Sequence, residues 1–303
     1  MSGQLDSFLK QAKRLLKRVE PLLPPERVAI DWQLCKAARW QQVGRFGQLV
    51  PMAVNLSLQL DDLQGLEQQR MALQRNTLQL LQGYPTNHAL LWGARGTGKS
   101  SLVRALLAAY VDQGLRLIEV EREGLEQLPR IVEGLAGLPY KFIVFCDDLS
   151  FEAGEWDYRI LKSVLDGSLE QAPDNVVLYA TSNRRHLVPE RQADNANWQQ
   201  VDGEIHPSEA VEDKIALSDR FGLWLSFYPF TQAHYLEVVY HWIAHWAAPA
   251  GLVWERSQAT DLAAIQWATQ RGNRNGRCAA QFAKFWVGQQ LLDQALAAAE
   301  QNP

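Results

Sequence analysis

The segment that most limits how this chain can fold is the octapeptide Gly93–Ser100, with the sequence Gly-Ala-Arg-Gly-Thr-Gly-Lys-Ser. It fits the pattern G-x-x-x-x-G-K-[ST] and stands between a short apolar run, 88–92, and a helix-length segment, 99–110. Glycines in such a turn let backbone N–H groups face one centre at the start of the helix. A strand, a tight turn and a helix in this order predict a phosphate-binding loop.

Short apolar runs recur after this loop, separated mostly by helix-length segments of mixed polarity. The runs cover residues 115–120, 142–146, 176–180 and 223–227. Near-continuous apolar strands that alternate with helices are typical of a parallel sheet covered on both faces. We therefore expect an α/β fold, with a three-layer αβα P-loop core over residues 61–230.

Helical patterns flank this core on both sides. Residues 1–60 begin with an amphipathic helical pattern and place Trp32 and Trp40 on a second expected helix, which predicts an N-terminal helical accessory region. After Pro229 the apolar runs stop, and residues 231–303 are expected to form a small all-helical lid domain.

One stretch, residues 190–207, is polar and has no periodicity. A loop of that length within a compact domain is usually either functional or disordered, and the sequence does not choose between these alternatives.

The composition excludes several classes of protein. The 30 Lys and Arg residues against 34 Asp and Glu give a net charge of −4, so nucleic-acid binding over the whole surface is excluded and a local contact stays possible. The 3 cysteines form no C-x-x-C pair, which fits a reducing compartment. No apolar run approaches the roughly 20 residues of a membrane-spanning helix, and no secretory signal begins the chain. We expect a cytoplasmic protein with no transmembrane segment.

The loop and the strand that ends in two acids predict a Mg·ATP site. Lys99 supplies a point charge for the β- and γ-phosphates, and the Ser100 hydroxyl is a natural Mg²⁺ ligand. Asp147 follows the apolar run 142–146 and is expected to hold Mg²⁺, directly or through water, while Asp148 orients the attacking water. The sequence has no N-K-x-D string for guanine, which favours ATP over GTP.

Three further polar groups have two readings each. Asn183 is the last of three polar residues that follow the apolar run 176–180, and it either reaches the γ-phosphate or simply closes a turn. Arg220 precedes the last strand and either acts as an arginine finger in a neighbouring subunit or forms an internal salt bridge. Arg274 and Arg277 flank the start of the last helix, where one of them could fold over the nucleotide or both could be solvated.

This order of parts resembles the AAA+ ATPase superfamily over about residues 61 to 290. The resemblance implies that Lys99 and Ser100 belong to Walker A, Asp147 and Asp148 to Walker B, Asn183 to the first sensor, Arg220 to the arginine finger and Arg277 to the second sensor. It also implies that residues 65–67 line the adenine pocket. The residues implied to bind the nucleotide are Gly93, Ala94, Arg95, Gly96, Thr97, Gly98, Lys99, Ser100, Ser101 and Arg277.

Four longer strings resemble a narrower group, the bacterial family of ATP-binding proteins labelled as a domain of unknown function. These strings begin at Leu91, Phe145, Ala180 and Leu217. One departure from the AAA+ pattern concerns the residue after the metal-binding aspartate, which is usually Glu and here is Asp148. Its carboxylate is one methylene shorter, so we expect slow hydrolysis or assistance from Glu152.

These features favour a Mg²⁺-dependent AAA+ ATPase that acts as a homo-oligomer and remodels an unidentified protein partner. A slow or non-hydrolysing nucleotide-dependent switch or adaptor is the first alternative, because of Asp148. A helicase-loader-like DNA-associated ATPase is a variant of the main hypothesis. A small-molecule P-loop kinase is disfavoured, since a helical lid follows the sheet and no second substrate pocket is evident.

Overall fold

The computed structural model describes residues 13–14, 30–43, 46–149, 161, 165, 173–183, 199–201, 204–206 and 219–300. Glu152 and most of the first amphipathic pattern lie outside the described residues. Two described pieces of the polar stretch 190–207 are the short strands β7 (Gln199–Val201) and β8 (Glu204–His206), which pair antiparallel.

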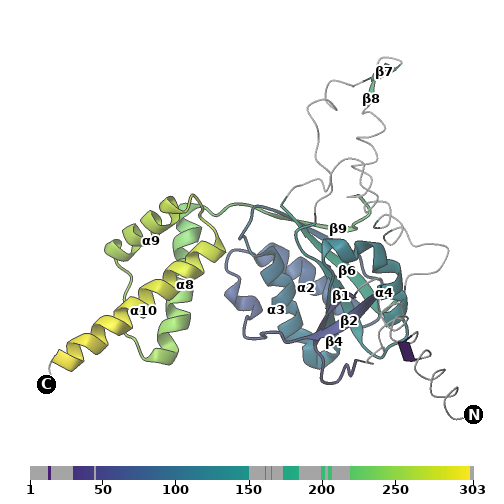
Figure 1. The fold of residues 1–303 in the computed structure, drawn as a ribbon. Helices are drawn as coiled ribbons and strands as arrows, with labels where there is room; N and C mark the ends of the chain where they lie inside the picture. Colours follow the sequence, from purple (N-terminus) through teal and green to yellow (C-terminus); the bar gives the residue numbers. More distant parts are fainter. Residues whose placement is uncertain are drawn as a thin grey trace, which may run out of the picture.

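The core of the protein is a seven-stranded sheet in the order β2-β1-β4-β5-β6-β3-β9 (Figure 1). Its strands are β1 (Ala37–Val43), β2 (Phe46–Met52), β3 (Ala89–Gly93), β4 (Leu115–Glu119), β5 (Lys141–Cys146), β6 (Val176–Ser182) and β9 (Leu223–Phe227). Every pairing is parallel except that of β1 with β2. The expected α/β core is confirmed, and the carboxyl ends of β3, β5 and β6 lie at one edge of the sheet.

Helices cover both faces of this sheet, so the core has three layers. The helices α2 (Glu67–Leu81) and α3 (Lys99–Tyr110) pack on one face, and α4 (Leu128–Leu135) and the 3-10 helix η4 (Arg122–Gln127) pack on the other. Neighbouring residues of one strand point to opposite faces, as the pleat requires. Each layer therefore buries a continuous set of apolar side chains against the central sheet.

The hairpin β1–β2 corrects one expectation. The predicted helix across Trp32 and Trp40 is wrong, because Trp40 lies on strand β1. Ala37 and Ala38 are both fully buried, and they lie in the apolar clusters on opposite faces of the sheet. Neighbouring residues that point to opposite faces are typical of a strand. Pairing with β4 supplies the backbone hydrogen bonds that a helix would otherwise make locally. We therefore propose that the core begins with this hairpin and that the lid begins after residue 230.

The lid is a small bundle of α8 (Gln232–Ala250), α9 (Gln258–Gln270) and α10 (Gly276–Glu300), which lies to one side of the sheet in Figure 1. The hydroxyls of Thr231 and Ser257 cap two of these helices, because they accept hydrogen bonds from backbone N–H groups in the first turns of α8 and α9. Tyr235, Ile243 and Phe282 lie in its apolar core. Within the part of the chain that is described, no helix combines the length and apolar character needed to cross a bilayer.

Candidate functional site

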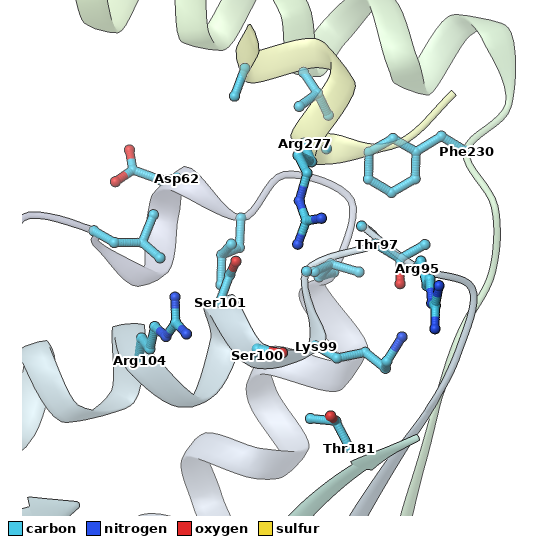
Figure 2. Close-up of a pocket in the computed structure, with 18 of the residues that line it drawn as sticks. Asp62, Arg95, Thr97, Lys99, Ser100, Ser101, Arg104, Thr181, Phe230 and Arg277 are labelled. Carbon is cyan, nitrogen blue, oxygen red and sulfur yellow. The ribbon is translucent and has the colours of Figure 1, made fainter. Parts of the chain in front are cut away.

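A cavity of about 610 Å³ lies where the carboxyl ends of the core strands meet the lid. Its walls come from the P-loop and α3, from the residues after β5 and β6, from the 3-10 helix η2 (Leu60–Asp62), and from α8 and α10 of the lid. Figure 2 shows Arg277 extending from the start of α10 into this cavity, above Lys99 and Ser100 of α3. Of the sequence-predicted binding residues, those from Arg95 to Ser101 and Arg277 line this cavity, whereas Gly93 and Ala94 are not part of its wall.

The backbone of the loop depends on glycine at two positions. Gly93 has a φ of 138° and lies so close to β9 that an added Cβ would be 1.9 Å from the Phe227 carbonyl oxygen. Gly98 has a φ of 102° immediately before α3 begins. Residues with a side chain rarely adopt such angles, so glycine is required for the turn that directs N–H groups toward the cavity.

Lys99 is the buried cation of the site. Only 6% of Lys99 is exposed, and its Nζ donates hydrogen bonds to the carbonyl oxygens of Gly93 (2.8 Å) and Ala94 (2.7 Å) and to Asn183 Oδ1 (3.2 Å). Burial lowers the pKa of the ammonium group, and the nearby carboxylates of Asp147 and Asp148 oppose this shift. Three oxygen acceptors around one ammonium group form a setting in which phosphate oxygens can replace carbonyl oxygens.

Hard oxygen ligands for a divalent cation meet beside Lys99. The hydroxyls of Ser100 and Thr181 each donate a 2.6 Å hydrogen bond to the same oxygen, Asp147 Oδ1. Mg²⁺ is usually held by one or two such protein oxygens together with substrate phosphates. The donor set at Ser100 and Asp147 therefore fits Mg²⁺. The residues described contain no group of three or more His, Cys, Asp or Glu that could hold a metal by itself.

Asp148 has an unusual backbone, with a φ of 53°, which makes it the one non-glycine residue with positive φ in the described part of the chain. Its N–H donates to Thr181 Oγ1 (2.9 Å), and its carboxylate accepts a hydrogen bond from Asn183. Arg95 Nη2 lies 3.6 Å from the second carboxylate oxygen. A left-handed conformation in a non-glycine residue costs about 1 to 3 kcal/mol and persists where surrounding contacts enforce it, as at functional sites.

The two arginines at the start of α10 differ in position. Both are exposed, but Arg277 lines the cavity and Arg274 is not part of its wall. The same helix start contacts the P-loop directly: the N–H of Gly276 donates to the Gly96 carbonyl oxygen (2.9 Å), and Asn275 Nδ2 donates to that of Arg95 (3.1 Å). One backbone and one side-chain hydrogen bond therefore join the lid to backbone carbonyl groups of the P-loop.

Arg220 lies outside the wall of this cavity, as the second residue of the described segment 219–300 and just before β9. Its predicted role as a finger in a neighbouring subunit stays a prediction.

Several residues of the cavity were not foreseen. Thr181 had a signal in the sequence, because it begins the polar triplet that ends strand β6. Asp62, Arg104 and Trp242 also line the cavity, but they lie far apart in the sequence and belong to no motif. His241 Nε2 is 3.1 Å from Asp62 Oδ1, so this histidine joins α8 to η2.

Comparison with known families identifies the chain. Residues 33–290 match the family described as "Protein of unknown function (DUF815)". The chain belongs to this family. The structure contains the P-loop, the mostly parallel sheet and the helical lid that the resemblance to AAA+ ATPases implied.

Two of the solved structures that match part of this chain are those of RuvB and Orc1. The Holliday junction branch migration motor RuvB of Thermotoga maritima is 18% identical, with a TM-score of 0.46, and the match covers 75% of this chain and 63% of RuvB. The Orc1 protein of Aeropyrum pernix, solved in complex with DNA, is 16% identical, with a TM-score of 0.48, and covers 73% of this chain and 61% of Orc1. The chain thus spans less than two thirds of either protein. A search of curated proteins found no significant match.

Proposed function

We propose that this DUF815 protein binds ATP with Mg²⁺ and hydrolyses the β–γ phosphoanhydride bond. The observation that carries this proposal is the convergence of Lys99, the Ser100–Asp147 pair and the Asp148–Asn183 pair in one cavity. A buried ammonium group, a hard-oxygen metal site and a carboxylate beside an amide are the parts that phosphoryl transfer to water requires. The proposal includes an assembly of several copies and an unidentified protein partner that the ATPase cycle remodels.

Each residue has a separate task in this scheme. Lys99 and the N–H groups at the start of α3 hold the phosphates, and bound Mg²⁺ would neutralise charge on the β- and γ-oxygens. Asp148 accepts a hydrogen bond from the attacking water and orients it in line with the bond that breaks. Asn183 holds Asp148 through one end of its amide and contacts Lys99 through the other. Arg277 neutralises phosphate charge from the lid side of the cavity.

The first test separates binding from hydrolysis. We expect Asp148→Asn to bind Mg·ATP at least as tightly as the unaltered protein, because a negative charge near the γ-phosphate is removed. Its phosphate release should fall by about 100-fold, since loss of a general base or water-orienting group costs roughly 10² to 10⁴ in rate. Calorimetric titration measures the binding, and a phosphate-release assay measures the rate. Equal rates in both proteins would contradict the role of Asp148.

A nucleotide-dependent switch with slow hydrolysis is the second candidate. The short side chain of Asp148 and its contact with Arg95 favour this reading. Single-turnover hydrolysis of Asp148→Glu, measured in the same assay, discriminates between the two functions. A large gain in rate supports the switch, because a working ATPase should already be fast with Asp148.

The assembly is tested by mixing two inactive variants. We expect Arg220→Ala to bind ATP and lose turnover, because a finger completes the site of a neighbour. Lys99→Ala keeps its own Arg220 and loses ATP binding. Mixtures of the two should recover part of the phosphate release, with a dependence on protein concentration. Loss of ATP binding in Arg220→Ala by itself would contradict the finger role.

A further inference from the structure

The side chain of Arg95 joins the P-loop to the carboxylate that the proposed function assigns to water. Arg95 Nη2 lies 3.6 Å from Asp148 Oδ2, and the two side chains are 77% and 57% exposed. Exposed ion pairs at this separation contribute little to stability, because water and salt compete for both charges. The guanidinium can therefore leave Asp148 when a stronger acceptor is offered.

The backbone beneath this side chain is held in place. Asn275 Nδ2 donates to the Arg95 carbonyl oxygen (3.1 Å), and the Gly96 carbonyl oxygen accepts the N–H of Gly276. An added Cβ on Gly96 would be 2.5 Å from the Asn275 side chain, so loop and lid are in close contact here. A change of partner by Arg95 thus needs rotation of its side chain and no movement of the loop.

A γ-phosphate held by Lys99 would lie within the same small group of side chains. Lys99 Nζ contacts Asn183 Oδ1, and Asn183 Nδ2 contacts Asp148. One residue thus separates the cation that binds phosphate from the carboxylate that Arg95 reaches. Guanidinium groups bind phosphate oxygens through two parallel hydrogen bonds, a stronger arrangement than a single solvated contact with a carboxylate.

We propose that Arg95 is a positioning residue that changes partner during the ATP cycle. It pairs with Asp148 before the terminal phosphate arrives, and then it pairs with that phosphate and frees Asp148 to orient water. The inference rests on the proposed ATPase function and adds a specific control of it. ADP, which has no γ-phosphate, leaves the Arg95–Asp148 pair in place.

The test is a double-mutant cycle on the full chain, with the β,γ-imido analogue of ATP and with ADP as ligands in calorimetry. Asp148→Asn relieves repulsion toward the γ-phosphate in any background. Where Arg95 is present, Asp148→Asn also removes the Arg95–Asp148 ion pair, which must otherwise break before Arg95 can bind the γ-phosphate. We expect Asp148→Asn to raise the affinity for the ATP analogue by a factor that is about two- to fivefold larger when Arg95 is present than in the Arg95→Gln background. For ADP the two gains should be equal.

A fixed, purely structural pair gives a different result. If Arg95 stays paired with Asp148 when nucleotide binds, the guanidinium screens the carboxylate charge from the γ-phosphate. Asp148→Asn then raises the affinity for the ATP analogue more in the Arg95→Gln background, where this screening is absent. That result, or equal gains for the ATP analogue, overturns the change of partner and leaves the proposed function intact. An unaltered protein that binds neither ligand overturns both proposals.

The control for charge is Arg130→Gln. Arg130 lies on α4, is exposed and is not part of the cavity wall. This variant loses one exposed guanidinium, as Arg95→Gln does, and it should bind both ligands like the unaltered protein. Thermal melts of all variants confirm that they remain folded.

Discussion

Lys99→Met should lower the affinity for Mg·ATP by about 100-fold or more, while the protein stays folded. Charge-assisted hydrogen bonds contribute roughly 1.5 to 3 kcal/mol each, and two such bonds to phosphate oxygens account for at least two orders of magnitude. Methionine keeps the length of the apolar stem and removes only the ammonium group, so the P-loop loses its cation with little change in packing. Calorimetric titration with Mg·ATP measures the affinity, and a thermal melt checks the fold.

The matched control is Lys141→Met. Lys141 begins strand β5, is not part of the cavity wall, and its Nζ makes a long hydrogen bond of 3.5 Å to the Asp174 carbonyl oxygen. This variant removes one positive charge, as Lys99→Met does, and it should bind ATP as the unaltered protein does. Binding by Lys99→Met within about threefold of the unaltered protein, a difference of roughly 0.7 kcal/mol, would mean that nucleotide is held elsewhere.

Arg116→Met should lower the free energy of unfolding by about 3 kcal/mol, because it removes the donor of several buried hydrogen bonds. Arg116 is 3% exposed, and its guanidinium donates to the carbonyl oxygens of Trp32 (2.7 Å), Val111 (2.9 Å) and Leu115 (2.8 Å). It also lies over the ring of Tyr140, 4.4 Å from the ring centroid. Loss of the buried charge offsets part of the cost, since desolvation of a guanidinium is unfavourable.

Denaturant unfolding measures this effect, with Arg39→Met as the control. Arg39 forms ion pairs with Glu119 (3.0 Å) and Glu121 (3.5 Å), yet its side chain is 45% exposed. Exposed pairs contribute about 0 to 1 kcal/mol, so this variant should be nearly as stable as the unaltered protein. Equal stability of the two variants would contradict a structural role for the carbonyl contacts of Arg116.

The P-loop core was predictable because its signals are local in the sequence. The turn at 93–98 needs glycine for steric reasons that hold in any fold, and the buried strands show as unbroken apolar runs. The caps at Thr231 and Ser257 depend on local signals of the same kind, since each hydroxyl accepts a hydrogen bond from the backbone N–H three residues later in the chain. These elements are confirmed where the structure describes them.

The hairpin at 37–52 was not predictable in the same way. Its residues show no strong period of their own, and their strand conformation depends on pairing with β4, about 80 positions away. The same limit applies to Thr181, whose importance depends on its contact with Asp147, the residue that follows the neighbouring strand β5. Sequence spacing carries no information about which strands become neighbours.

The sequence by itself determined the loop that can hold phosphate, the acids that follow a buried strand, and the order of sheet and lid, because each depends on the chemistry of adjacent residues. Only the tertiary structure decided that Arg277 and not Arg274 enters the cavity, that Arg95 meets Asp148, and that Asn275 ties the lid to the P-loop. Each of these contacts joins segments that are far apart in the chain. Their distances are set by the order of the strands within the sheet and by packing of the lid against the core, and no local pattern records either.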